Sequence, residues 1–98
     1  MKFSLVFTKE AEIQLKKLKN DRGKAKQYKA VVKSLKLLKE NPRHPSLQSH
    51  KYRTLKGPDG EDIFEAYAQQ STPSAYRIFF CYSKKKEQIV IISIIPHP

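Results

Sequence analysis

The feature that most constrains the fold is a run of aromatic and aliphatic residues at positions 76–82, Tyr-Arg-Ile-Phe-Phe-Cys-Tyr. This density of aromatic and β-branched side chains favours a buried β-strand over a helix. Because side chains alternate across a strand, Arg77, Phe79 and Cys81 share one face and the other four share the opposite face. An arginine in such a strand loses hydration unless it reaches a cleft or an anionic partner. Arg77 therefore either extends past a sheet edge into solvent or binds an anion, and the rest of the chain favours the second alternative.

Length and cysteine content set the limits of the fold. We expect the 98 residues, 1–98, to form a single domain with a modest core. No run approaches the length of a membrane span and the N-terminus lacks an apolar signal region, so we expect a cytoplasmic protein with no membrane partner. Cys81 is the only cysteine, which excludes an intramolecular disulfide and fits a reducing compartment. Its position among aromatic residues indicates a packed thiol rather than a nucleophile.

The charge of the chain is large and unevenly distributed. The formal net charge is +11, with 20 Lys and Arg residues against nine Asp and Glu residues. Sixteen of the basic residues but only four of the acidic ones lie in residues 1–56, so that this part carries +12 and the remainder −1. Such asymmetry indicates a polyanionic partner: nucleic acid, an anionic membrane surface or an acidic protein. A solvated surface needs no such imbalance, and we favour nucleic acid or an acidic protein.

The hydrophobic pattern predicts an α+β fold with the order β-α-α-β-β-β-β. Thr8 is a suitable N-cap for the first helix, with Glu10 and Glu12 in its first turn. We expect this helix to carry an apolar stripe formed by Ala11, Leu15 and Leu18, with Ile13 nearby. Proline-containing and glycine-containing segments separate the elements. An N-terminal strand, a two-helix hairpin and an antiparallel four-strand meander are therefore expected. The expected ranges are strand 2–7, helices 9–19 and 24–40, and strands 52–55, 63–68, 75–82 and 88–95.

Candidate functional residues lie on or beside the predicted sheet. The face that the helices leave uncovered would carry the chemistry, with Arg77 on one strand, Glu65 on the preceding strand and His97 just after the last. Four residues are candidates for contacts with an RNA backbone, although a solvated surface explains them equally well: His50, Lys51, Arg53 and Lys56. His44 and His50 have no Cys or carboxylate partner at metal-ligand spacing, so we expect no metal site.

Several segments in a fixed order resemble one known family over nearly the whole chain. They are residues 8–11 after the first strand, 41–42 after a basic helix, 55–57, 76–80, and 96–98 after the last strand. In order and spacing they resemble the RelE/ParE superfamily of toxins from type II toxin–antitoxin systems. The combination of Glu65, Arg77 and His97 resembles the RelE, YoeB and YafQ-like mRNA interferases in particular.

The resemblance implies a metal-independent endoribonuclease that cuts messenger RNA on the ribosome and needs no cofactor. In this chemistry the RNA 2′-hydroxyl attacks the adjacent phosphate, which requires a base, an acid and a cation. Arg77 matches the family's strand arginine, whose planar fork suits a phosphate. His97 matches a near-terminal histidine that transfers a proton in some branches, and Glu65 is the candidate base. The implied partners are a cognate antitoxin, the ribosome and mRNA, in the bacterial cytoplasm.

The sequence also departs from the family pattern and leaves alternatives open. The RelE prototype has lysines on the strand where this chain has Glu65 and Tyr67, and Tyr82 is the one candidate for its late aromatic residue. The alternative to a catalytic role for Glu65 is a purely structural ion pair with Arg77. The alternative for His97 is a frayed residue near the end of the chain. Two further functions stay open: a ParE-like inhibitor of DNA gyrase, which shares the fold but generally lacks the acid–base set, and an inactive basic module that binds RNA or protein.

Overall fold

A computed structural model describes residues 2–97 of the chain. The helices and strands follow each other in the predicted order. Two short 3₁₀ turns are added, one before the second helix and one before the second strand. The elements are β1 (Ser4–Phe7), α1 (Lys9–Asn20), η1 (Arg22–Lys24), α2 (Ala25–Glu40), η2 (Pro45–Leu47), β2 (His50–Lys56), β3 (Asp62–Tyr67), β4 (Tyr76–Tyr82) and β5 (Gln88–Pro96). All predicted boundaries agree to within two residues, and β2 extends beyond its predicted range by two residues at the start and one at the end.

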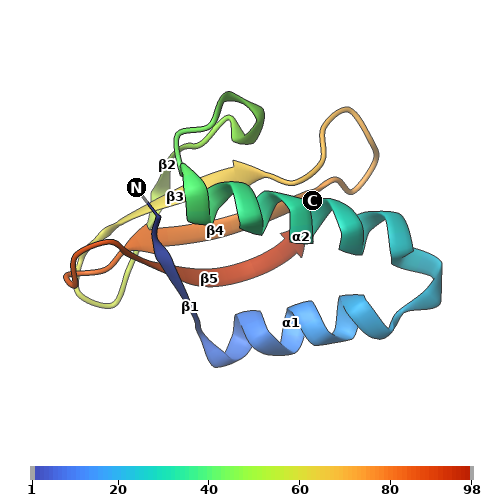
Figure 1. The fold of residues 1–98 in the computed structure, drawn as a ribbon, viewed down its shortest axis with the longest axis horizontal. Helices are drawn as coiled ribbons and strands as arrows, with labels where there is room; N and C mark the ends of the chain where they lie inside the picture. The colour runs from blue at the N-terminus through green and yellow to red at the C-terminus, as the bar shows by residue number, and fades with distance from the viewer. Residues whose placement is uncertain (1, 98) are drawn as a thin grey trace.

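The strands form one five-stranded sheet in the order β1-β5-β4-β3-β2 (Figure 1). The β2–β5 meander is antiparallel throughout, which confirms the predicted α+β fold. β1 pairs in parallel with β5, so the sheet is mixed. β5 is therefore an interior strand, as its β-branched sequence predicts.

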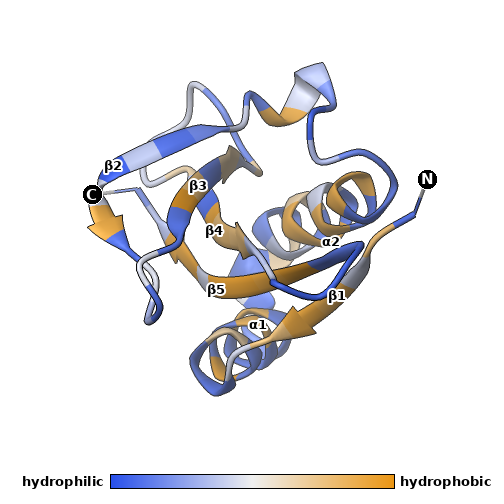
Figure 2. Cartoon of the chain, turned by 90° about the vertical axis from the view of Figure 1, so that its left-hand side faces the viewer, coloured by the Kyte–Doolittle hydropathy of each residue, from blue (hydrophilic) through white to orange (hydrophobic). Residues whose placement is uncertain are grey.

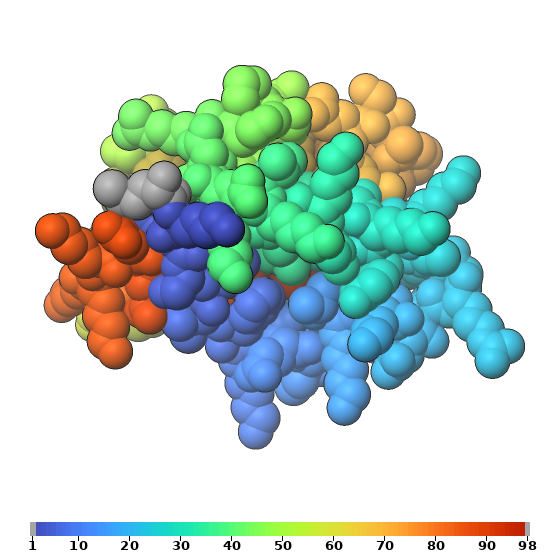
Figure 3. Space-filling view, viewed as in Figure 1, coloured from blue at the N-terminus to red at the C-terminus, as the bar shows by residue number. Residues whose placement is uncertain are grey.

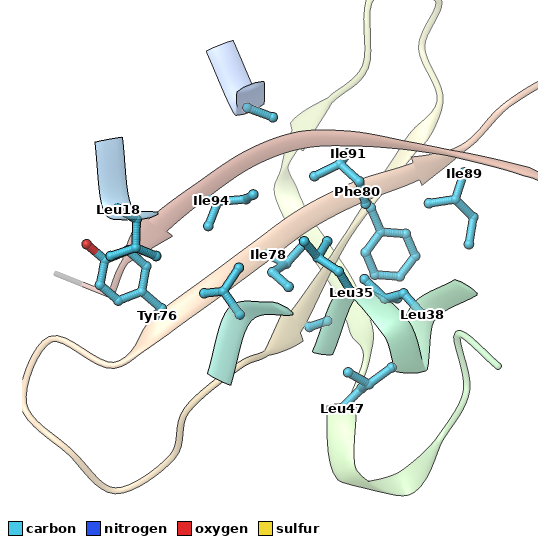
Figure 4. Packing of buried hydrophobic residues seen from close by; sticks show 13 residues of the cluster. Leu18, Leu35, Leu38, Leu47, Tyr76, Ile78, Phe80, Ile89, Ile91 and Ile94 are labelled. Carbon is cyan, nitrogen blue, oxygen red and sulfur yellow. The ribbon is translucent and has the colours of Figure 1, made fainter. Parts of the chain in front are cut away.

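Both helices pack on one face of the sheet and enclose the hydrophobic core. Leu35 and Leu38 of α2 point toward Ile78 and Phe80 of β4 (Figure 4). Phe80 and Ile78 are fully buried, as their alternation with Arg77 predicts. The apolar stripe predicted for α1 is correct for Ala11, Leu15 and Leu18. Ile13 was wrongly included in it: its side chain is 57% exposed, because it projects from the opposite side of the helix.

The N-cap and the first two turns of α1 cover the edge of β5 beyond the end of β1. Thr8 caps the helix as predicted, because its Oγ1 accepts a hydrogen bond from the Ala11 N–H at 3.1 Å. The same hydroxyl donates to the Ile92 carbonyl at 2.8 Å, and the Ile94 N–H donates to Gln14 Oε1 at 2.7 Å. Side chains of α1 thus satisfy backbone groups of β5 that would otherwise form an open strand edge.

The opposite face of the sheet carries the candidate site. The register pairs Glu65 with Phe79 and Tyr67 with Arg77, and these residues alternate with those of the core. β2 forms the sheet edge beyond β3 and is coloured mostly hydrophilic in Figure 2. This polar strand borders the uncovered face.

Candidate functional site

Glu65 and Arg77 form a buried pair of opposite charge on the uncovered face. Glu65 is 6% exposed and Arg77 is 9% exposed. They lie on neighbouring strands, two register positions apart, with Arg77 Nε 3.5 Å from Glu65 Oε2. The sequence placed them on consecutive strands at the expected uncovered face, and the structure brings the two side chains into contact.

The guanidinium of Arg77 is held in place by β3 and the loop that follows it. Its Nη1 donates to the Gln69 carbonyl at 2.8 Å, and its Cζ lies 3.8 Å from the centre of the Tyr67 ring. The Nε–H is buried but makes no hydrogen bond to any residue in the range 2–97. Glu65 is near enough to attract it without forming a well-aligned bond. A buried guanidinium with an unused N–H is suited to an additional anion.

His50 lies beside Glu65 at the start of β2. Its Nε2 is 3.0 Å from Glu65 Oε1, and its Nδ1 is 2.9 Å from the Gln48 carbonyl oxygen. His50 and Arg77 therefore contact the two carboxylate oxygens of Glu65 separately. The sequence singled out His50 for RNA contacts, and its position next to Glu65 was not foreseen.

Glu65 and His97 line the same small cleft, although 32 positions separate them in the sequence. The cleft has a volume of about 130 Å³. The backbone N–H of His97 donates to the Ala75 carbonyl at 2.7 Å, which anchors this end of the chain beside β4. The lining residues are Tyr52, Glu65, Phe79, Ile95, Pro96 and His97. The structure thus brings Glu65, Arg77 and His97 to one region, with Glu65 as the residue common to the ion pair and the cleft.

The lysines of β2 are not brought to this cleft. Lys51 follows His50 on the strand and points to the other face, where its Nζ is 3.3 Å from Asp62 Oδ2. Lys56 also pairs with Asp62, and the two ammonium groups lower the pKa of that carboxyl below its ordinary value. Arg53 is exposed on the same strand. Contacts of these residues with RNA stay a prediction.

Two tyrosines that the sequence did not assign lie at the site. Tyr67 stacks on Arg77, and Tyr52 lines the cleft with its ring edge-to-face against Phe79 at 5.0 Å. Strand alternation was the available signal for Tyr67, which shares a face with Glu65. Tyr82, the candidate late aromatic residue, lies instead on the helix-covered face, where it packs against Phe80.

Other groups of the chain are placed away from this chemistry. Cys81 is buried, as predicted, and burial raises the pKa of its thiol. Within residues 2–97, His, Cys, Asp and Glu side chains do not gather in threes that could hold a metal ion. No helix in the described part of the chain is long and apolar enough to cross a membrane.

Solved structures match this chain over nearly its full length. The YoeB/ParE toxin from Agrobacterium tumefaciens matches with a TM-score of 0.71 and 14% identity, over 98% of this chain and 100% of that one. The archaeal RelE–RelB complex from Pyrococcus horikoshii matches with a TM-score of 0.65 and 18% identity, over 98% of this chain and 96% of the matched chain. The E. coli DinJ–YafQ toxin–antitoxin complex matches with a TM-score of 0.66 and 12% identity, over 99% of this chain and 94% of the matched chain. The chain has the RelE/ParE toxin fold. No family model and no curated protein matches its sequence.

In this RelE-type fold, the uncovered sheet face holds a carboxylate, a guanidinium and two imidazoles in one region. Glu65 contacts His50 and Arg77 directly and shares the cleft with His97. A guanidinium binds phosphate, and carboxylate and imidazole groups transfer protons. The site therefore has the groups that a metal-independent phosphate-transfer reaction needs.

Proposed function

We propose that the chain is the toxin of a type II toxin–antitoxin pair and cleaves messenger RNA on the ribosome without a metal ion. The observation that carries the proposal is the convergence of Glu65, Arg77 and His97. A carboxylate and an imidazole line one cleft, and the carboxylate contacts a buried guanidinium. The RelE-type fold adds support for this function, and the bacterial cytoplasm, where ribosomes lie, is the proposed location.

In the proposed reaction Glu65 accepts the proton of the RNA 2′-hydroxyl, whose oxygen attacks the adjacent phosphorus. The bond from phosphorus to the 5′-oxygen breaks, His97 gives that oxygen a proton, and a 2′,3′-cyclic phosphate remains on the upstream fragment. Arg77 stabilises the charge that develops on the phosphate. Stacking on Tyr67 and the bond to the Gln69 carbonyl orient the guanidinium before RNA binds, which lowers the cost of positioning it.

His50 is a positioning residue in this proposal. Its contact with Oε1 fixes one side of the Glu65 carboxylate, while Arg77 approaches Oε2. The rotamer of the proposed base is thus held by two partners. Replacing His50 should reduce the rate of cleavage and leave the Arg77 contacts with Gln69 and Tyr67 in place.

An antitoxin is the proposed protein partner. The matched YafQ is part of a toxin–antitoxin complex. In this chain residues 1–56 carry +12, which suits capture by an acidic polypeptide or attraction to RNA. The ribosome and mRNA are the proposed targets of the free toxin.

The test is induction of the chain in bacteria, with growth recorded and messenger RNA 5′ ends mapped. The variants are Arg77→Ala, Glu65→Gln and His97→Ala, with Lys26→Gln as a control on the exposed surface of α2. We expect codon-phased cleavage with the unchanged chain and with Lys26→Gln. Arg77→Ala should reduce cleavage at least about 100-fold, the usual loss when one transition-state donor is removed.

Three other results would contradict all or part of this proposal. Growth arrest with intact messages would exclude the nuclease and favour the ParE-like action on gyrase. No arrest and no cleavage would indicate an inactive relative that binds RNA or protein. Full cleavage by His97→Ala would remove that residue alone from the mechanism.

A further inference from the structure

Tyr82 ends β4 with an aromatic ring that the candidate site does not use. Its ring packs against Phe64 at 5.4 Å, Phe80 at 5.9 Å and Phe3 at 6.2 Å between ring centres. Tyr82 is nevertheless 37% exposed. Burial raises the pKa of its hydroxyl, and the positive charge of Arg43 acts in the opposite direction. The Tyr82 side chain is therefore held by three neighbouring rings, partly exposed, and near a cation.

Two basic segments converge around this ring. The Phe3 N–H donates to the Lys39 carbonyl at 2.7 Å, and the Ser4 N–H donates to the Glu87 carbonyl at 2.8 Å. The start of the chain thus joins segment 39–43 to the hairpin 83–87, which follows Tyr82 directly. Together the two segments contain five basic and two acidic residues. Figure 1 shows the hairpin beside β1, and Figure 3 shows its side chains projecting into solvent.

The acidic residues at the start of β3 and just before it, Asp62 and Glu61, do not cancel this positive charge. Asp62 is already paired with Lys51 and Lys56. After burial, the negative charge of Glu61 is the second cause that raises the pKa of the Cys81 thiol. The Cys81 side chain points to the opposite face of the sheet from that of Tyr82. The lysines of the hairpin are exposed, and no ion pair joins them to the described part of the chain.

We propose that Tyr82, segment 39–43 and hairpin 83–87 form a second RNA-binding surface, separate from the cleavage cleft. A base of single-stranded RNA stacks on the Tyr82 ring, and neighbouring phosphates contact Arg43 and the hairpin lysines. The partly exposed aromatic side chain favours RNA over an acidic protein, since stacking on an aromatic platform suits every nucleobase. The inference rests on the proposed function for its choice of RNA as ligand. It adds a surface on the opposite side of the sheet from Arg77.

The test measures binding of a fluorescein-labelled 2′-O-methyl oligouridine by anisotropy at several salt concentrations. This probe has no free 2′-hydroxyl, so binding is measured whether or not the chain cleaves RNA. The variants are Tyr82→Leu, Tyr82→Phe and Lys85→Gln, with Lys26→Gln on α2 as the matched control. Circular dichroism establishes that each variant is folded.

We expect Tyr82→Leu to weaken binding about tenfold and Tyr82→Phe to leave it unchanged, because stacking needs the ring and not the hydroxyl. Lys85→Gln should make the negative slope of log affinity against log salt less steep by about 0.7, because one phosphate contact is lost. Lys26→Gln should not change this slope. Lys85 lies in an exposed hairpin, so this arm decides the question even if Tyr82→Leu unfolds.

Unchanged affinity and salt slope in Tyr82→Leu and Lys85→Gln would overturn the second surface and leave the proposed nuclease standing. Equal effects of Lys85→Gln and Lys26→Gln would also overturn it, because they would indicate attraction by net charge alone. A fluorescein-labelled acidic peptide serves as a second probe. If Tyr82→Leu and Lys85→Gln weakened binding of this peptide but not of the oligouridine, the surface would bind protein and the proposal would be overturned.

Discussion

Replacing Arg77 with methionine tests whether the guanidinium is held inside the protein or extends into solvent. The change removes a hydrogen bond from a charged donor to the Gln69 carbonyl, which contributes about 1.5–3 kcal/mol. It also removes the stack on Tyr67, which contributes about 1 kcal/mol. Glu65 loses one of its two partners while remaining buried. We expect unfolding to become easier by about 3 kcal/mol, the lower end of the range for breaking a buried pair.

Urea unfolding followed by circular dichroism measures this loss. With an m-value of about 1.5 kcal/mol per molar urea, a loss of about 3 kcal/mol lowers the midpoint by about 2 M. Arg53→Met is the matched control, because Arg53 is exposed on β2. We expect it to change stability by less than about 0.5 kcal/mol.

The double variant Arg77→Met with Glu65→Gln separates the ion pair from the other contacts. Without its charge, residue 65 no longer needs a cationic partner, so we expect a coupling energy of about 1–2 kcal/mol between the two sites. A cost of less than about 1 kcal/mol for Arg77→Met alone would refute the reasoning. It would show that the arginine extends past the sheet edge into solvent.

Three further predictions concern parts of the fold outside the cleft. Thr8→Val should cost about 1–2 kcal/mol in urea unfolding, because the α1 cap and the bond to the Ile92 carbonyl are both lost; Thr54→Val, at an exposed position, is the control. The lowered pKa of the Asp62 carboxyl means that its ion pairs stabilise the fold above the ordinary value of 3.8 and cease to do so as pH falls through the folded-state pKa. Asp62→Asn should therefore destabilise the protein at pH 7 and make little difference under strongly acidic conditions, and an equal effect at both would contradict this. The Cys81 thiol should react with iodoacetamide only on unfolding, since it is buried and its pKa is raised; rapid labelling of the native protein would show otherwise.

Local sequence patterns were sufficient to predict the elements and much of the core. Thr8 and the acidic residues after it marked the start of α1, because capping and the helix dipole depend on neighbours within one turn. The alternation in β4 assigned Arg77 and Phe80 to opposite faces, because adjacent side chains in a strand point in opposite directions.

Predictions that depended on the direction in which a side chain points were less complete. Ile13 was assigned to the core by its proximity in sequence, but its angle on the helix places it in solvent. Tyr82 was considered for the site as a match to the late aromatic residue of the family, but an odd number of positions separates it from Arg77 and the two side chains face opposite sides. The aromatic residues at the site, Tyr52 and Tyr67, come from β2 and β3 instead.

The sequence by itself determined the order of helices and strands, the faces of β4 and the concentration of positive charge in residues 1–56. These properties depend on spacing and composition along the chain. Only the tertiary structure decided that β1 pairs in parallel with β5, that His50 contacts Glu65 and that His97 lines the same cleft. Each of these depends on which strands become neighbours and in which register, and that choice is made by packing of the whole core rather than by any local pattern.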